Sequence, residues 1–125
     1  MVLIDTCGII ELCKPVPALK PSTIERVDAG AVILSISFAE IGCKVKAGKL
    51  RMSKTPLELY KAFLEIQSIS LIDIGVQEWL DSINLDWPQN RDPADRLVVA
   101  YARTYELTIV SSDKMMRKFY KHVIW

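Results

Sequence analysis

Short apolar runs alternate with longer amphipathic segments along the whole chain. The short runs have the length and β-branched content of buried strands, and the longer segments repeat apolar residues at helical spacing. The predicted strands are 1–4, 31–35, 69–74, 107–110 and 121–125. The predicted helices are 6–13, 22–30, 37–50, 55–68, 76–87, 92–106 and 113–120. This alternation predicts right-handed β-α-β units on a parallel sheet.

Residues typical of helix starts support two of these boundaries. Ser22 is the predicted N-cap of a helix that carries Glu25 three positions later, which is a capping-box pattern. Thr55 and Pro56 are a cap and a first helical residue of the usual types. We therefore expect one α/β domain over residues 1–125, a three-layer α/β/α sandwich around a parallel sheet of four to five strands.

Apolar spacing also predicts which face of two helices is buried. In the fourth predicted helix, Leu57, Tyr60, Leu64 and, less clearly, Phe63 share one face. In the fifth, Trp79 and Ile83 lie four positions apart. These side chains are expected to face the core. The tryptophans as a group are interpreted as core or dimer contacts rather than base-stacking platforms: Trp79, Trp87 and Trp125.

Composition and charge narrow the possible functions. The formal net charge is +1 at pH 7, so binding to nucleic acid would depend on a local patch. With one histidine and no Cys-x-x-Cys pair among Cys7, Cys13 and Cys43, a zinc site of thiolates and imidazoles is not expected. We interpret these cysteines as reduced, semi-buried thiols of a cytoplasmic protein. The first residues, MVLIDTCGIIEL, have no basic lead and no long apolar run, so we do not expect them to be a signal peptide. No stretch approaches the ~20 apolar residues that a membrane helix requires.

Several acidic residues follow the predicted strands. Asp5 comes directly after the first strand, and Asp113 comes shortly after the fourth. Glu40 lies in the first turns of the helix after the second strand, and Asp92 and Asp95 are three apart at the start of a later helix. Because sites in open parallel sheets lie beyond the carboxyl ends of the strands, these carboxylates are expected to gather at one edge.

Such a cluster of carboxylates is costly without a counter-charge. Two like charges 4 Å apart repel by about 4 kcal/mol at an effective dielectric constant of 20. Hard oxygen ligands with few imidazoles or thiolates suit Mg²⁺ or Mn²⁺. A bound divalent ion can activate water and offset charge on a phosphoryl group, so a phosphodiester is a reasonable substrate.

The stretch RDPADR places two acids beside two arginines. Asp92 is a suitable N-cap for the helix that starts there, and Asp95, one turn later, is the better inward-facing ligand. Arg91 and Arg96 are expected to offset the local charge or to bind phosphate. The apolar LVVAYA that follows predicts the buried face that holds this helix in place.

Four motifs in this order resemble the PIN-domain proteins, specifically the VapC toxins of toxin–antitoxin pairs. The motifs are LIDT, SFAEIGCKVKAGKL, RDPADRLVVAYA and IVSSDKMM. The resemblance covers the whole chain and is loosest over 49–90. It implies a strand order of 3-2-1-4-5, a homodimer, a cognate antitoxin, and an endoribonuclease that uses Mg²⁺ or Mn²⁺ to hydrolyse RNA.

The resemblance also assigns roles to individual residues. The family's acidic positions, catalytic and metal-binding, fall on Asp5, Glu40, Asp95 and Asp113. Asp92 matches a less constant fifth acid. The supporting hydroxyls of the family fall on Thr6 and Ser111. The family often has histidine before RDP, where this chain has Asn90, so no imidazole is expected to act there.

Each candidate residue also has a purely structural interpretation. Asp5, Asp92 and Asp113 could serve only as helix caps, and Glu40 could be an ordinary solvated helix residue. A basic group is interpreted as a solvated face and, less favoured, as an RNA track: Lys44, Lys46, Lys49 and Arg51. Arg117, Lys118 and Lys121 have the same two interpretations.

Other functions were weighed against the nuclease. A phospho-receiver domain needs paired acids after the first strand and a lysine after the fifth, and this chain supplies neither. A haloacid-type phosphatase needs Asp-x-Asp after the first strand, where Cys7 stands in place of the second acid. A non-catalytic PIN-like scaffold is the main alternative, although a scaffold has no need for four mutually repelling acids.

Overall fold

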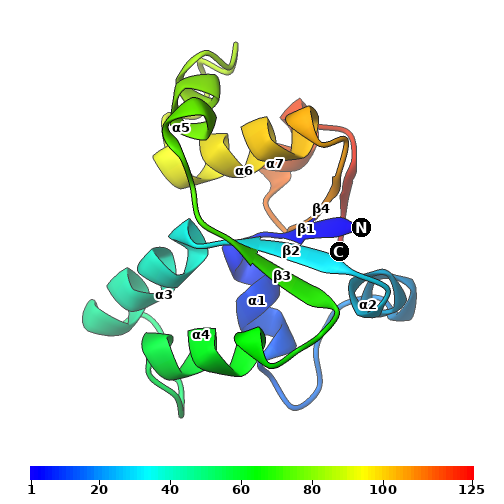
Figure 1. The fold of residues 1–125 in the computed structure, drawn as a ribbon, viewed down its shortest axis with the longest axis vertical. Coiled ribbons are helices and arrows are strands. Elements are labelled where there is room, and N and C mark those ends of the chain that lie inside the picture. The colour runs from blue at the N-terminus through cyan, green and yellow to red at the C-terminus, as the bar shows by residue number, and fades with distance from the viewer.

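The computed structural model describes residues 1–125, and one five-stranded sheet lies at its centre with the order β3-β2-β1-β4-β5 (Figure 1). All four pairs of neighbouring strands are parallel. The strands are β1 (Val2–Ile4), β2 (Ala31–Leu34), β3 (Ile69–Ile72), β4 (Thr108–Val110) and β5 (Val123–Ile124). The predicted parallel sheet and its strand order are confirmed.

Helices cover both faces of this sheet (Figure 1). The helices are α1 (Thr6–Leu12), α2 (Pro21–Asp28), α3 (Ile36–Lys46), α4 (Pro56–Leu64), α5 (Val76–Ile83), α6 (Pro93–Thr104) and α7 (Lys114–Phe119). The first four share one apolar cluster with the sheet, and α6 and α7 share the other, with α5 packed on α6. The structure is therefore the expected α/β/α sandwich.

Alternation along the central strand divides the two cores. Val2 and Ile4 of β1 belong to the cluster on the α1–α4 side, whereas Leu3 between them belongs to the cluster on the α6 side. All three side chains are at most 1% exposed. A strand buried on both faces must be apolar at every position, so the polar residue that follows it marks the point where the strand leaves the core.

Gly8 lets α1 start directly against the ends of β1 and β4. A Cβ at this position would lie 2.9 Å from Ile4 Cγ2 and 3.1 Å from the Val110 carbonyl oxygen. Both distances are shorter than ordinary contacts, so any larger residue would push the first turn of α1 outward. The glycine thus holds the residues just before it, Asp5 to Cys7, at the sheet edge.

Several predicted helix boundaries are wrong. Helices α3 and α4 end at Lys46 and Leu64, before the predicted ends at 50 and 68. Helix α2 starts at Pro21 with Lys20 as its N-cap, and no side chain caps it, so Ser22 is inside the helix. The fixed φ of proline suits the first helical position, which explains the earlier start. Helix α5 ends at Ile83, and Trp87 lies beyond it in a connection, 2% exposed. None of the helices combines the length and the apolar character that crossing a membrane requires.

The predicted apolar faces of α4 and α5 are only partly buried. On α4, Leu59 and Phe63 are buried, whereas Leu57 and Leu64 are 61% and 53% exposed. On α5, Ile83 is 68% exposed. The helices keep an outward apolar face because only their opposite sides meet α3, β3 and α6. The expectation of semi-buried thiols is wrong for two of the three cysteines, since Cys13 and Cys43 are exposed.

Candidate active site

Strands β1 and β4 are neighbours, and their carboxyl ends bring distant acidic residues together. The backbone N–H of Asp5 donates to the Val110 carbonyl at 3.1 Å, so the two strands end side by side. Asp113 follows β4 after two serines and is the N-cap of α7. A parallel pairing thus places residues that are far apart in the sequence at the same edge.

One cavity of about 250 Å³ opens at this edge. The four carboxylates that line it come from four separate helix starts or turns: Asp5, Glu40, Asp95 and Asp113. Thr6, Cys7, Lys44 and Ser112 also line it. The structure therefore brings together all four acids that the sequence singled out.

Asp5 is the most buried of the four acids, at 6% exposure. Its Oδ1 accepts a hydrogen bond from the Thr6 backbone N–H at 2.8 Å, which caps α1. Its Oδ2 accepts one from the Ser111 hydroxyl at 2.9 Å. The same hydroxyl accepts the backbone N–H of Asp113 at 3.1 Å, so Ser111 joins the two acids. Asp5 therefore caps α1 and also lines the cavity.

A second hydrogen-bonded group holds Glu40. The Thr6 hydroxyl lies 2.5 Å from Glu40 Oε1 and 3.0 Å from Ser37 Oγ. Because a hydroxyl has one proton, Thr6 donates to the carboxylate and accepts from Ser37. Ser37 is fully buried and was missed, although its place one helical turn before Glu40 puts both on the same face of α3.

Asn90 orients Asp95 from outside the cavity. Its side-chain amide donates to Asp95 Oδ2 at 3.0 Å, and its amide oxygen accepts the backbone N–H of Asp92 at 2.8 Å. Asp92 in turn accepts the backbone N–H of Asp95 at 3.0 Å as the N-cap of α6. Asp92 is exposed and does not line the cavity, so the structure favours its role as a cap.

The two arginines of RDPADR have different positions. Arg96 does not line the cavity and donates to five backbone carbonyls, two at the end of α5 and three in the α5–α6 connection, at 2.6–3.3 Å. Its five N–H groups are all used, so the expectation that Arg96 binds phosphate or offsets the acids is wrong. Arg91 is exposed, makes no hydrogen bond in the structure and does not line the cavity.

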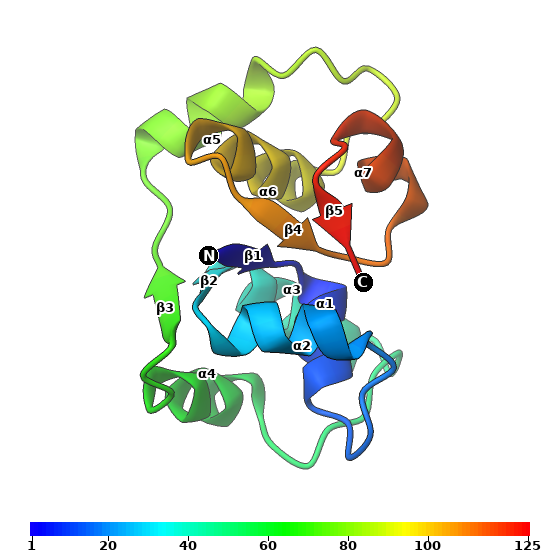
Figure 2. The same cartoon turned by 90° about the vertical axis from the view of Figure 1, so that its right-hand side faces the viewer.

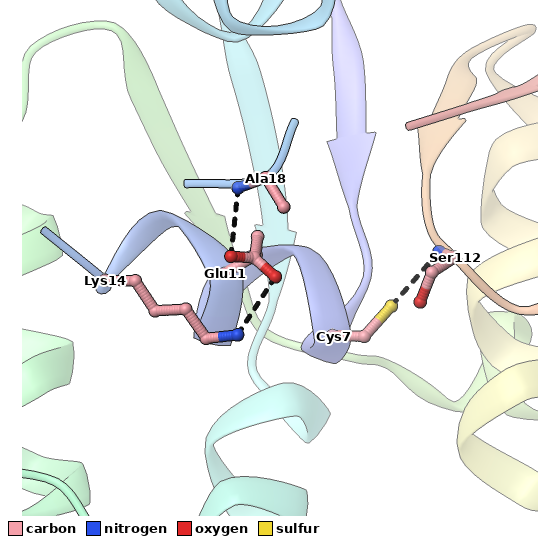
Figure 3. A network of polar contacts seen from close by, with 5 residues as sticks. All are labelled: Cys7, Glu11, Lys14, Ala18 and Ser112. Carbon is pink, nitrogen blue, oxygen red and sulfur yellow. Dashed lines mark hydrogen bonds and ion pairs between the residues drawn. The ribbon is translucent and has the colours of Figure 1, made fainter. Parts of the chain in front are cut away.

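Two cavity residues had been interpreted as merely structural. Cys7 was expected only to pack, yet its Sγ lies at the cavity, where it accepts the Ser112 backbone N–H at 3.4 Å (Figure 3). Lys44, one turn after Glu40, was assigned to a solvated basic face, yet it also lines the cavity. It is the one cationic side chain that does so.

The cavity raises the pKa of Asp5, Glu40 and Asp95. Burial is the main cause of the raised pKa of Asp5, and the nearby Asp113 adds to it. Burial also raises the pKa of Glu40, with smaller contributions from Asp5 and Asp92. Burial raises the pKa of Asp95 to about 6, although the Asn90 hydrogen bond opposes the shift. The single lysine of the cavity, Lys44, therefore does not compensate for the burial of these acids and for their mutual repulsion.

The variant Asp95→Asn is expected to be more stable than the natural chain at neutral pH when divalent ions are chelated. The folded pKa of about 6 exceeds the reference value of 3.8, so the charge penalty is complete above pH 6 and disappears below the reference pKa. If Asp95 were fully buried, the variant would gain roughly 3 kcal/mol in the free energy of unfolding. Because Asp95 is partly exposed, the expected gain is about 1–2 kcal/mol. Urea unfolding across this pH range measures it.

The matched control is Asp86→Asn, because Asp86 is exposed and outside the cavity. It should change stability equally little at every pH. A gain for Asp95→Asn that did not shrink between pH 6 and 4 would contradict the explanation by a buried charge.

The donor set suits a hard divalent cation, since carboxylates and hydroxyls surround a cavity that is short of positive charge. In this structure, however, no three Asp, Glu, His or Cys side chains are arranged so as to hold one ion. The residues fit a Mg²⁺ or Mn²⁺ ion in their chemistry, while their spacing is not that of a formed coordination site.

Comparisons with solved structures support the fold. A toxin–antitoxin complex from Klebsiella pneumoniae contains a similar chain, with 15% identity, a TM-score of 0.65, and coverage of 100% of this chain and 97% of that one. The crystal structure of FitAcB from Neisseria gonorrhoeae contains a chain that is 18% identical, with a TM-score of 0.59. The match covers 100% of this chain and 97% of that one. The structure of FitAB bound to an IR36 DNA fragment contains a chain that is 17% identical, with a TM-score of 0.60. The match covers 90% of this chain and 85% of that one.

The family comparison covers nearly the whole sequence. A comparison with curated proteins gave no match. The family model of the PIN domain matches residues 2–122, which include every acid of the cavity. The parallel sheet of order 3-2-1-4-5, with acids at the carboxyl ends of its central strands, agrees with that match. The chain belongs to the PIN domain family.

Proposed function

We propose that this protein is a cytoplasmic endoribonuclease that depends on Mg²⁺ or Mn²⁺, and that it is the toxin of a toxin–antitoxin pair. The main support is the cavity lined by Asp5, Glu40, Asp95 and Asp113, which come from distant parts of the chain. The family is one of nucleases in general, and the motifs resemble VapC toxins in particular.

Some residues of the cavity would bind the cation, and others would orient the side chains that bind it. The four carboxylates would bind the cation, which when bound supplies Lewis-acid activation of water and neutralises phosphoryl charge. Thr6 and Ser111 fix the rotamers of Glu40 and Asp5 through the hydrogen bonds described above. Such preorganised groups favour in-line attack on a phosphodiester because they need no rearrangement during the reaction.

Incubation of the purified chain with structured RNA tests the activity. We expect endonucleolytic fragments in Mn²⁺ or Mg²⁺, none with a chelator, and none with Glu40→Gln in either buffer. Single-stranded DNA serves as the substrate control. Cleavage of DNA but not RNA would refute the substrate class. Chelator-resistant cleavage would refute the metal dependence. No cleavage by well-folded, metal-supplied protein would favour the non-catalytic scaffold.

A cognate antitoxin and a second copy of this chain are the proposed partners. The similar chains in the solved toxin–antitoxin complexes support the antitoxin, although their identity to this chain is low. The second copy is supported by an apolar face on α5, where Val76, Leu80 and Ile83 are 75%, 49% and 68% exposed. Helix α4 flanks the same edge strand, β3, and also has outward leucines (Figure 2).

The variant Ile83→Glu is therefore expected to be a monomer. A carboxylate inside an apolar dimer contact would be buried without a partner, which costs several kcal/mol. Size-exclusion chromatography with light scattering measures the mass. The control is Val16→Glu, since Val16 is 84% exposed in the α1–α2 connection. A natural chain that is monomeric, or a dimer that survives Ile83→Glu, would refute this interface.

A further inference from the structure

A second cavity, which shares no lining residue with the acidic one, runs along the β5 edge of the sheet. Its volume is about 530 Å³, and residues of the α1–α2 connection, α2, α7 and β5 line it. Figure 2 shows β5 at this edge, with α7 above it and α2 below it. We call this cavity the basic groove, because its charged side chains are all cationic: Lys20, Arg26, Arg117 and Lys121.

The cations of the basic groove have no acidic partners. The single ion pair in the chain joins Lys14 to Glu11, and no aspartate or glutamate side chain lines the groove. Figure 3 shows that Glu11 is engaged by Lys14 and by the backbone N–H of Ala18, both at 3.1 Å. That contact fixes the connection from which Lys20 projects, and it occupies Glu11, so this acid does not pair with the cations of the groove. Four unpaired cations in a chain of net charge +1 form a local positive patch.

The basic groove also contains groups that suit nucleotides. Ser22 and Thr23 supply hydroxyls, and the half-buried Trp125 supplies an aromatic ring. A cationic groove with an aromatic side chain is the usual arrangement for single-stranded nucleic acid, with cations on phosphates and the ring stacked on bases. Trp125 also packs against the edge of the apolar cluster on the α1–α4 side, as its interpretation as a core contact predicts, and its remaining surface lines the groove.

The basic groove lies beside the acidic cavity. The Ile124 carbonyl, at the groove, accepts the backbone N–H of Ser111 at 3.0 Å, and the Ser111 hydroxyl donates to Asp5. Helix α7 also joins the two sites, because its N-cap Asp113 lines the acidic cavity and its Arg117 lines the groove. The groove is also at the opposite edge of the sheet from β3, where we place the dimer contact, so it stays open in the proposed dimer.

We propose that the basic groove binds the phosphodiester backbone of single-stranded RNA next to the acidic cavity. This inference rests on the proposed function for its substrate class, and it adds a binding surface remote from the reacting phosphate. Phosphates held in the groove would present the neighbouring part of the strand to the acids. Trp125 would stack on a base and so contribute affinity without charge.

The test is fluorescence anisotropy with a labelled single-stranded RNA of mixed sequence, in chelator so that no cleavage occurs. The double variant Arg117→Gln and Lys121→Gln is expected to bind about tenfold more weakly. Each lost phosphate contact reduces the slope of log affinity against log salt by about 0.7, so the two together reduce it by about 1.4. Trp125→Leu should weaken binding at least about fivefold and leave that slope unchanged.

The matched control is Arg103→Gln with Lys118→Gln, which removes the same charge from exposed positions outside the groove. It should bind RNA like the natural chain. The proposal would be overturned if the groove variant and the control variant had the same slope of log affinity against log salt. It would also be overturned if the groove variant still bound RNA but no longer bound an acidic antitoxin segment. Thermal unfolding verifies that each variant is folded, and Lys20→Gln with Arg26→Gln replaces the first pair if it is not.

Cleavage assays on the same proteins separate this proposal from the proposed function. A natural chain that binds RNA through the groove but never cleaves it would refute the nuclease and leave the groove intact. A natural chain that cleaves RNA, with a groove variant that binds and cleaves equally well, would refute the groove alone.

Discussion

Replacing Arg96 by methionine is expected to lower the free energy of unfolding by about 3–5 kcal/mol, while the same change at Arg91 has almost no effect. The Arg96 guanidinium donates to the carbonyls of Ser82 and Ile83 at the end of α5 and to three more in the connection that follows. Without it, five carbonyls lose a charged donor in a partly buried region.

The Arg96 contacts also reach the acidic cavity through one intermediate. Arg96 holds the Asn90 carbonyl at 2.8 Å, and the Asn90 side chain orients Asp95. The variant should therefore lose cleavage activity as well as stability. Arg96→Lys should recover little of either, because an ammonium is a single point of charge and cannot replace the planar fork.

Urea unfolding measures this difference through the midpoint at constant m-value. Arg91→Met is a close control because Arg91 lies in the same six-residue stretch, is exposed and has no hydrogen bond in the structure. Equal midpoints for the two variants would show that the carbonyl contacts of Arg96 do not stabilise the fold.

The different positions of Arg91 and Arg96 could not be predicted from the sequence. Both arginines stand beside an aspartate in RDPADR, so the local pattern gives them one role. What separates them is the course of residues 84–90, whose carbonyls face Arg96. Backbone carbonyls are the same in every sequence, and the connection has no periodicity that fixes its path. Its geometry follows from how α5 and α6 pack.

The sheet and its acids could be predicted because they depend on patterns that the sequence carries directly. Apolar runs mark strands, alternation with helices makes the strands parallel, and an acid after a strand lies at the carboxyl edge. Asp5 and Asp113 meet for this reason, once β1 and β4 are neighbours. The order of the strands came from the resemblance to a known family, since apolar patterning alone does not determine it.

The faces of α4 and α5 could not be predicted because spacing shows that apolar residues share a side without showing what covers that side. Leu57 and Ile83 lie on regular apolar stripes, yet both are exposed in the single chain. A stripe that meets a partner molecule has the same period as one that meets the core. Sequence alone therefore assigned both stripes to the interior.

Asp5→Asn is expected to abolish RNA cleavage and the stabilisation of the fold by Mn²⁺. The amide oxygen can still accept the Thr6 N–H, so the cap of α1 and the fold should persist. The natural chain should gain about 2.7 kcal/mol of stability when Mn²⁺ is at 100 times its dissociation constant. The variant should gain little, because it loses the anionic ligand at the most buried position of the cavity.

Asp73→Asn provides the control, and it makes the experiment a test of topology as well as of charge. Asp73 directly follows β3 as Asp5 follows β1, but β3 is an edge strand and Asp73 is exposed outside the cavity. Thermal unfolding at rising Mn²⁺ should therefore show a full gain for Asp73→Asn. If Mn²⁺ does not stabilise the natural chain, or if it stabilises Asp5→Asn and Asp73→Asn equally, the four acids are not a cation site. The nuclease proposal then loses its main support.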